Sequence, residues 1–231
     1  MRILFDHQVF SWQTYGGISR YFVEQMRELE ALGQEVFLPE HFFSENVYLR
    51  QFPDFQRKSL TSFPLKGKKI LQNTLGRRAS RKAISQKNPN VFHPTYFDPY
   101  FLKTIEKRAI PFVITVHDMI HEIYGHGSRN FFSLDAHVVE NKRILAEKAA
   151  AVIAVSENTR LDLLRFCPQI DPAKIHVIHH GNSLHPNSNV QHPTSNIQHP
   201  MGSGGTCWRH WVFGVGCWML GVGCSAPVPK L

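Results

Sequence analysis

Residues 1–38, MRILFDHQVFSWQTYGGISRYFVEQMRELEALGQEVFL, contain the pattern that decides the fold. Arg2–Phe5 is a short apolar run, typical of a buried strand. Apolar side chains then recur at helical spacing from Ile18 to Leu32, and Gly33 stands where a helix C-terminal cap belongs. A second strand is predicted over Glu35–Leu38. The order strand, glycine turn, helix and strand is typical of the start of a parallel α/β sheet.

The same alternation continues to about residue 184. The segments that we predict as strands are Asn90–Pro94, Phe112–Val116, Val152–Val155 and Ile175–Ile178, and the predicted helices are His137–Lys148 and the segment from Ser156 to Phe166. This pattern predicts an α/β domain with a Rossmann-like, doubly wound parallel sheet. Ligands of such sheets bind at the carboxyl ends of the strands, so polar residues that directly follow a strand are candidate site residues.

A glycine pair precedes the first long helix. We expect a polar loop after Phe5 that closes with Gly16 and Gly17. Glycines at a helix N-terminus let backbone N–H groups approach a phosphate, and Arg20, one turn further on, could pair with the same anion. The pattern is shorter than a GxGxxG or P-loop motif. The alternative is therefore a plain turn in which glycine supplies backbone freedom.

His117 and Asp118 follow a strongly β-branched predicted strand. A histidine at this place can hydrogen-bond a sugar hydroxyl or transfer a proton, and Asp118 could orient it or bind a cation. The alternative is a histidine that caps carbonyl groups of the loop. His121 and Glu122 repeat the pairing of histidine and acid, but the spacing lacks the internal glutamate of HExxH, so zinc is not expected.

Two more predicted strands end in polar residues. Ser156 and Glu157 are candidates for substrate binding, although a helix N-cap followed by an acid in the first turn explains them best. Asp6 and His7 end the first strand, where an acceptor could bind.

The chain is basic, with a formal net charge of +8. This charge favours an anionic partner such as nucleic acid, a phosphorylated ligand or an anionic membrane. Residues 57–87 hold ten Lys or Arg and no Asp or Glu, and Ile70, Leu71 and Leu75 lie among them. Both a solvated face and a membrane-surface helix fit this stretch. Nucleic acid is not the expected partner, because no nucleic-acid-binding motif is present.

The character of the chain changes after Ser183, where it reads HPNSNVQ and HPTSNIQ and later GVGCWML and GVGCSAP. Reverse translation of residues 190–200, read on the complementary strand in a shifted frame, reproduces Gly216–Cys224 except at one position. We infer that residues 185–231 are a translated inverted DNA repeat. We expect this low-complexity tail to be disordered and to follow a domain of residues 1–184. Its His and Cys lack the spacing of a metal site.

The cysteine content, the N-terminal sequence and the lengths of the apolar runs bear on where in the cell the protein is found. Cys167 is the only cysteine before residue 184, which is typical of a reduced, cytosolic domain without disulfides. The N-terminus lacks the pattern of a signal peptide, and no apolar run reaches the roughly 18 residues needed to cross a bilayer. We therefore expect a cytoplasmic protein, attached peripherally to the inner membrane face through residues 57–87.

Five segments, in this order, resemble the N-terminal half of bacterial family 4 glycosyltransferases: MRILFDHQVFSWQTYGGISRYFVEQ, NVFHPTYFDPYF, PFVITVHDMIHE, AAAVIAVSENTRLDLL and KIHVIHHGNSL. The likeness covers about residues 1–184. It implies a two-domain GT-B fold and transfer of a sugar from a nucleotide-sugar donor, with retention of configuration and with no metal ion or other cofactor. It also implies that Gly16–Gly17 lies near the donor diphosphate and the acceptor, and that His117 contacts the donor sugar. The acceptor would be a glycan or a lipid-linked saccharide.

The resemblance implies a donor-binding domain after the strand at Ile175–Ile178, where this chain has the repeat-bearing tail. Two lobes that hold donor and acceptor together are what makes the transfer fast. We therefore expect negligible turnover from these 231 residues. The alternative function is a non-catalytic fragment that binds a membrane surface or a partner protein.

Overall fold

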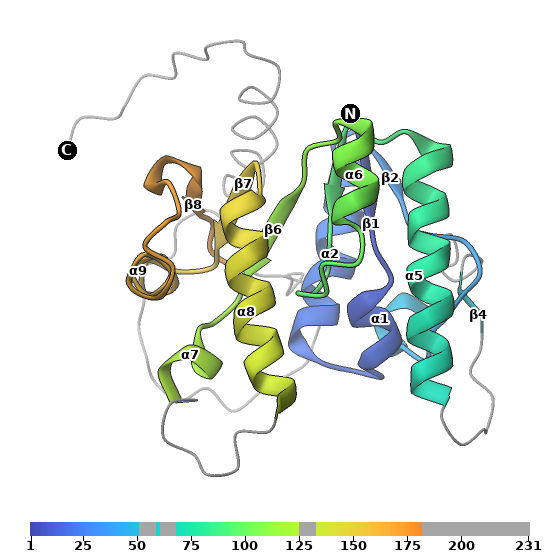
Figure 1. Cartoon of the computed structure of the whole chain (residues 1–231). Helices are drawn as coiled ribbons and strands as arrows, with labels where there is room; N and C mark the ends of the chain where they lie inside the picture. Colours follow the sequence, from blue (N-terminus) through green and yellow to red (C-terminus); the bar gives the residue numbers. More distant parts are fainter. Residues whose placement is uncertain (51–58, 61–67, 125–132, 182–231) are drawn as a thin grey trace, which may run out of the picture. The chain divides into compact units, whose positions relative to one another are not determined.

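The parallel α/β fold expected from the sequence is confirmed by a computed structural model, which describes residues 1–50, 59–60, 68–124 and 133–181 (Figure 1). The strands are β1 (Arg2–Phe5), β2 (Glu35–Phe37), β3 (Phe42–Phe43), β4 (Ser59–Leu60), β5 (Val91–His93), β6 (Val113–Val116), β7 (Ala151–Ala154) and β8 (Ile175–Val177). The helices are α1 (Gln8–Trp12), α2 (Gly17–Ala31), α3 (Val47–Arg50), α5 (Lys68–Lys87), α6 (Leu102–Arg108), α7 (Ile120–Tyr124), α8 (Ser133–Lys148) and α9 (Glu157–Phe166), with a 3₁₀ turn, η2, at Pro172–Lys174.

The main strands form two parallel sheets, with the orders β2-β1-β5 and β6-β7-β8. A parallel bridge between Phe92 and Phe112 joins β5 to β6, and the N–H of Phe92 donates to the carbonyl of Pro111 at 3.0 Å. The chain places β2 on one side of β1 and then crosses to place β5 on the other side. The strand order therefore reverses between β1 and β5, and the carboxyl ends beside such a reversal are where doubly wound sheets bind ligands.

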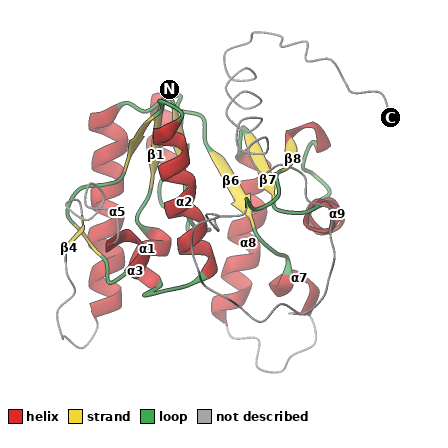
Figure 2. Ribbon diagram, turned by 180° about the vertical axis from the view of Figure 1, so that it is seen from behind, coloured by secondary structure: helices red, strands yellow, loops and turns green. Residues whose placement is uncertain are grey.

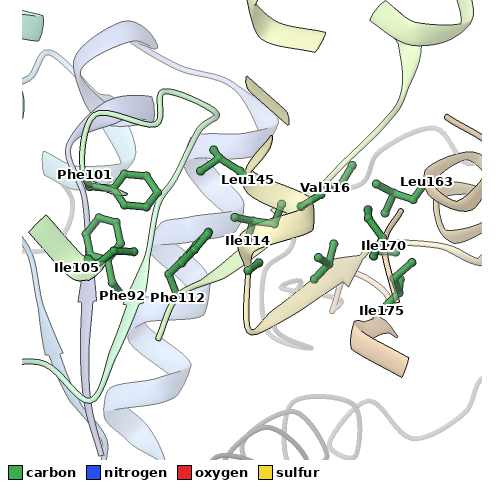
Figure 3. Close-up of a cluster of buried hydrophobic side chains, with 14 of the residues drawn as sticks. Phe92, Phe101, Ile105, Phe112, Ile114, Val116, Leu145, Leu163, Ile170 and Ile175 are labelled. Carbon is green, nitrogen blue, oxygen red and sulfur yellow. The ribbon is translucent and has the colours of Figure 1, made fainter. Parts of the chain in front are cut away.

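Helices cover both faces of the strands. Figure 1 shows α6 and α8 in front of the strands, and Figure 2, seen from behind, shows α2 in front of β1. A buried cluster that includes Phe92, Phe112, Ile114 and Leu145 packs β5 and β6 against these helices (Figure 3). Because the strands are buried on both faces, they read in the sequence as continuous apolar runs.

The boundaries of α2 follow from its sequence. Tyr21, Phe22, Met26 and Leu29 are buried on one face, at the spacing that predicted the helix. Gly33 follows the helix with φ +76°, and its N–H donates to the carbonyl of Glu30 at 2.9 Å. A left-handed residue after a helix is the position that glycine occupies without strain, so the predicted C-terminal cap is confirmed.

One part of the prediction was wrong. The expected polar loop after Phe5 contains α1, whose Val9 and Phe10 are buried. A helix of five residues is too short to show a hydrophobic period, and its stability comes from tertiary packing. The same reason explains why α6 and α7 were not predicted.

Three further observations bear on the ends and surface of the domain. Met1–Val177 form one compact unit. The predicted boundary at residue 184 and the predicted disordered tail lie outside the described residues. Within the described ranges, no helix has the length and apolar character needed to span a membrane.

Candidate functional site

The glycine pair lies at the start of α2, with Gly16 as the N-cap and Gly17 as the first helical residue. Gly16 has φ 170° and ψ 159°, an extended backbone that any residue adopts, so the interpretation that glycine supplies backbone freedom is wrong. A Cβ at Gly16 would come within 2.6 Å of Oε1 of Gln13, but one at Gly17 would meet no atom within 4 Å. The fold itself therefore does not require glycine at position 17, and the space beside it is open.

The first turn of α2 is suited to an anion. The N–H of Ser19 donates to Oε1 of Gln13 at 3.2 Å, and its hydroxyl donates to the carbonyl of Gly16 at 3.0 Å. The N–H of Gly17 comes before any helical acceptor, as at every helix start. Arg20 is exposed in the same turn. The partial positive charge of the helix end and the guanidinium charge both attract an anion to this place.

His117 lies at the carboxyl end of β6 and its ring packs against α2. Its ring centroid is 4.9 Å from that of Tyr21, edge to face, and 6.1 Å from that of Phe22. Tyr21 is four residues after Gly17 and therefore shares its face of the helix, and helical side chains lean towards the N-terminus. Through Tyr21 the structure brings His117 and the glycine pair into one region.

His93, at the end of β5, was not singled out from the sequence, and its ring shares a neighbour with His117, because both pack edge to face against Phe22. It is buried, its ring stacks on Phe5 with centroids 5.1 Å apart, and Nε2 is 3.1 Å from Oγ1 of Thr115. Burial, with a smaller contribution from the charge of His117, lowers the pKa of His93 to about 3. His93 is therefore neutral at physiological pH, and its ring packs against Phe5 and Phe22.

Asp118 is exposed and fixes the loop that follows His117. Its Oδ1 accepts a hydrogen bond from the N–H of Ile120 at 3.2 Å, and its carbonyl accepts one from Nζ of Lys142 at 3.0 Å. The carboxylate thus stabilises the turn at the start of α7, in the manner of an Asx turn.

Ser156 is confirmed as the N-cap of α9, because its Oγ accepts the N–H of Thr159 at 3.1 Å. Glu157 forms an ion pair with Arg160 at 2.6 Å, within the first turn of the helix. The strand before them pairs with β6, and the N–H of Val155 donates to the carbonyl of Val116 at 3.4 Å. Ser156 and His117 therefore follow neighbouring strand ends.

Asp6 and His7 are fully buried, so the expectation that an acceptor binds them is wrong. Oδ1 of Asp6 accepts the N–H of Gln8 and both the N–H and the hydroxyl of Thr95, at 2.7–3.2 Å. Its Oδ2 accepts the amide of Gln8 at 2.6 Å and the hydroxyl of Tyr100 at 3.0 Å. The carboxylate thus ties the end of β1 to the loop after β5.

The described part of the chain contains neither a candidate metal site nor a reactive cysteine. No group of three or more His, Cys, Asp or Glu there could hold a metal ion. Cys167 is buried and unpaired, and burial raises the pKa of its thiol to about 11. A thiol with so high a pKa is unreactive at neutral pH.

Comparison with known proteins identifies the family. The model of Glycosyltransferase Family 4 matches residues 15–184, a span that begins beside the glycine pair and includes His117 and Ser156. This chain belongs to glycosyltransferase family 4. The resemblance seen in the sequence is thereby confirmed. No curated protein matches the chain.

Three solved structures are similar to part of this family 4 chain. Sucrose-phosphate synthase from Thermosynechococcus elongatus superimposes with a TM-score of 0.50 at 16% identity, over 78% of this chain and 48% of that one. HepE from Anabaena, solved with UDP and glucose, gives 0.49 at 14% identity, over 79% and 45%. The lipopolysaccharide outer core galactosyltransferase WaaB gives 0.49 at 15% identity, over 80% and 47%. The family 4 chain therefore spans about half the length of these proteins.

Proposed function

We propose that this family 4 chain is the acceptor-side domain of a retaining glycosyltransferase, which moves a sugar from a nucleotide-sugar donor to a glycan or a lipid-linked acceptor. The proposal rests chiefly on one observation. Gly17 begins α2 with open space beside it, and the ring of His117 packs against Tyr21, one turn further along the same helix, within the span that the family model matches. An anion site beside a hydrogen-bonding ring suits a sugar joined to a diphosphate.

In the proposed reaction, the bond from the anomeric carbon to the diphosphate oxygen breaks and a bond from the acceptor oxygen to that carbon forms on the same face of the sugar. The proton of the acceptor hydroxyl passes to the departing diphosphate. Negative charge develops on the departing diphosphate. The N–H groups at the start of α2 and the guanidinium of Arg20 would stabilise that charge, so the proposed reaction needs no metal ion or other cofactor. His117 would hydrogen-bond the donor sugar and hold it against the acceptor.

Asp118, Ser156 and Glu157 would act beside this centre. Asp118 would shape the loop after His117, because its carboxylate and carbonyl both fix that loop. Ser156 and Glu157 follow the neighbouring strand end, and we propose that they contact the donor at the start of α9. Their oxygens already cap that helix and pair with Arg160, so they would contribute less than Gly17 and His117.

We further propose that these 231 residues bind donor weakly and turn it over negligibly. Fast transfer requires donor and acceptor to be held together from two sides, and the described domain supplies one side. We therefore use binding as the first test of the function, with transfer as the second.

Replacing Gly17 by alanine tests the proposed phosphate site. The added methyl group meets no protein atom within 4 Å, so the free energy of unfolding should stay constant or rise by up to about 1 kcal/mol. The same methyl group would block the approach of a phosphate to the helix N–H groups, so the affinity for a nucleotide sugar should fall at least tenfold. NMR titration with UDP-glucose, GDP-mannose and ADP-glucose measures that affinity, and chemical denaturation measures the stability.

The matched control is Ser85→Ala, an exposed position on α5 far along the chain from the site. It should bind as the parent does. A parent chain whose α2 and His117 resonances respond to none of the three nucleotide sugars would reject the function. A Gly17→Ala variant that binds as tightly as the parent would reject the role of the glycine alone.

A second candidate function is binding to an anionic membrane surface through α5. Ile70 and Leu71 are 75% and 41% exposed, beside the exposed Lys69. Apolar side chains between cations favour the lipid interface. Against this, part of the positive charge is neutralised in space, because Lys68, Arg77 and Lys87 form ion pairs with Glu45, Asp98 and Glu40. Most of residues 57–67 lies outside the described part.

Changing Lys69, Arg78 and Lys82 to glutamine should weaken binding to phosphatidylglycerol vesicles at least tenfold. Each basic residue near an anionic surface contributes about 1 kcal/mol, and all three side chains are exposed on α5. Vesicle co-sedimentation at low and high salt measures the effect. The control with equal charge loss changes Lys103, Lys107 and Arg165, which are exposed elsewhere. Equal losses in both triple variants would show only a net-charge effect and would reject α5 as the membrane surface.

A further inference from the structure

A buried ammonium group contacts the segment directly after His117 and the loop between β5 and α6. Lys142, on α8, is 1% exposed. Its Nζ donates to Oε2 of Glu122 and to the carbonyl of Asp118, both at 3.0 Å, and lies 3.9 Å from the sulfur of Met119. The same atom lies 5.1 Å from the centroid of the Phe97 ring, in the loop between β5 and α6.

Stability alone gives little reason for such a buried ion pair. The cost of removing two charges from water largely cancels their attraction, and an apolar pair of similar volume is often as stable. An apolar side chain, however, cannot donate a hydrogen bond to the carbonyl of Asp118. That carbonyl belongs to the residue directly after His117, so the ammonium group acts on the backbone that carries the ring.

We propose that Lys142 is a positioning residue, which sets the place of the His117 ring by holding residues 118–122, the loop after His117 and the first turn of α7, together with Phe97, to α8. The consequence for donor binding rests on the proposed function, whereas the placement of the ring does not.

Lys142 is suited to this role because α8 is packed firmly in the core. Leu145 and Ala146, three and four residues after Lys142, are fully buried in the core that joins α8 to β6. Lys142 therefore starts from a fixed backbone, and its three donors have directions set by Glu122 and Asp118. A side chain placed by the core can fix a loop more closely than the loop can fix itself.

The test replaces the ion pair by an apolar pair, Lys142→Met with Glu122→Leu, in the full chain. The single variant Lys142→Met should lower the Tm strongly, because it leaves the carboxylate of Glu122 buried without its cation. The double variant should recover most of that loss. It should nevertheless shift the His117 ring resonances and speed amide exchange at Ile120 and Ile123 at least tenfold, while the ring resonances of His93 stay in place.

The control is Arg143→Met, the neighbouring residue on α8. It removes surface ion pairs to Glu140 and Glu147 without touching the loop, so the His117 resonances should not move. If this apolar pair does not fold cooperatively, Lys142→Leu with Glu122→Met, a second pair without a hydrogen-bond donor, takes its place with the same readouts. A folded double variant with unchanged His117 resonances and unchanged loop exchange would overturn the proposal.

Titration with UDP-glucose separates this proposal from the function. If the parent binds and the double variant binds at least tenfold more weakly with its strands intact, both stand. If the parent does not bind but the double variant still displaces the His117 ring, Lys142 remains a positioning residue and the glycosyltransferase function fails. If the parent binds and the double variant binds equally well with an unmoved ring, the positioning role fails alone.

Discussion

Replacing Asp6 by alanine should lower the free energy of unfolding by roughly 3–5 kcal/mol. The carboxylate is fully buried and accepts five hydrogen bonds. Alanine would leave buried donors of Thr95, Gln8 and Tyr100 without an acceptor, and each such group costs about 1–3 kcal/mol. Denaturant unfolding followed by circular dichroism measures the change.

Two further variants make this test specific. Asp6→Asn keeps one oxygen for the donors of Thr95 but turns an NH₂ group towards Gln8 and Tyr100, so its cost should be smaller, about 1–3 kcal/mol. Glu35→Ala removes a carboxylate that is 67% exposed and pairs with Arg2 at 3.4 Å, so it should cost below about 1 kcal/mol. An Asp6→Ala variant that unfolds with the stability of Glu35→Ala would show that the carboxylate does not hold the two strand ends together.

Replacing Gly76 by alanine should destabilise the domain by about 2 kcal/mol, although alanine is normally the better helix former. Gly76 is buried in α5, and a Cβ there would lie 2.0 Å from Cδ2 and 2.5 Å from Nε2 of His7. The ring cannot easily move aside. Its Nδ1 is 2.8 Å from Oγ of Ser80, and its faces and edges meet Tyr100 and Phe42 at centroid distances of 5.5 and 6.4 Å.

A double-mutant cycle identifies the clash. In a His7→Ala background the obstacle is gone, so Gly76→Ala should there raise the free energy of unfolding by up to about 1 kcal/mol, the usual helix preference. The sign of the substitution therefore depends on the residue at position 7. If Gly76→Ala destabilised both backgrounds equally, the contact with His7 would not be the reason for glycine at this position. Thermal and denaturant unfolding of the four proteins measures the cycle.

The contacts of Asp6 and His7 also bear on the geometry of the candidate site. Asp6 holds the loop after β5 to the end of β1, and His7 holds α1 against α5. The ends of β1 and β5 lie where the strand order reverses, the place at which doubly wound sheets bind ligands. Loss of either contact should loosen the site as well as the fold.

The class of fold and most of its elements could be predicted from the order of residues alone. Long helices such as α2 can be predicted from apolar residues at helical spacing, and buried parallel strands such as β6 from continuous β-branched runs. Both patterns are local in the sequence. Gly33 and Ser156 were assigned as caps for the same reason, since a cap depends on its immediate neighbours. The five family segments likewise identified the family from the order of residues alone.

Which candidate residues are buried, and which are paired with distant residues, became clear from the tertiary structure. Residues 68–87 contain no acid, yet Glu40, Glu45 and Asp98 pair with their cations from other elements. Asp6 stands at a strand end as a ligand-binding residue would, but folding surrounds it with donors from Thr95 and Tyr100. Contacts between residues far apart in the chain, such as His117 with Tyr21 or Lys142 with Asp118, leave no mark on local spacing. Burial and pairing depend on these distant contacts, so they appear only when the sheet and its helices have packed.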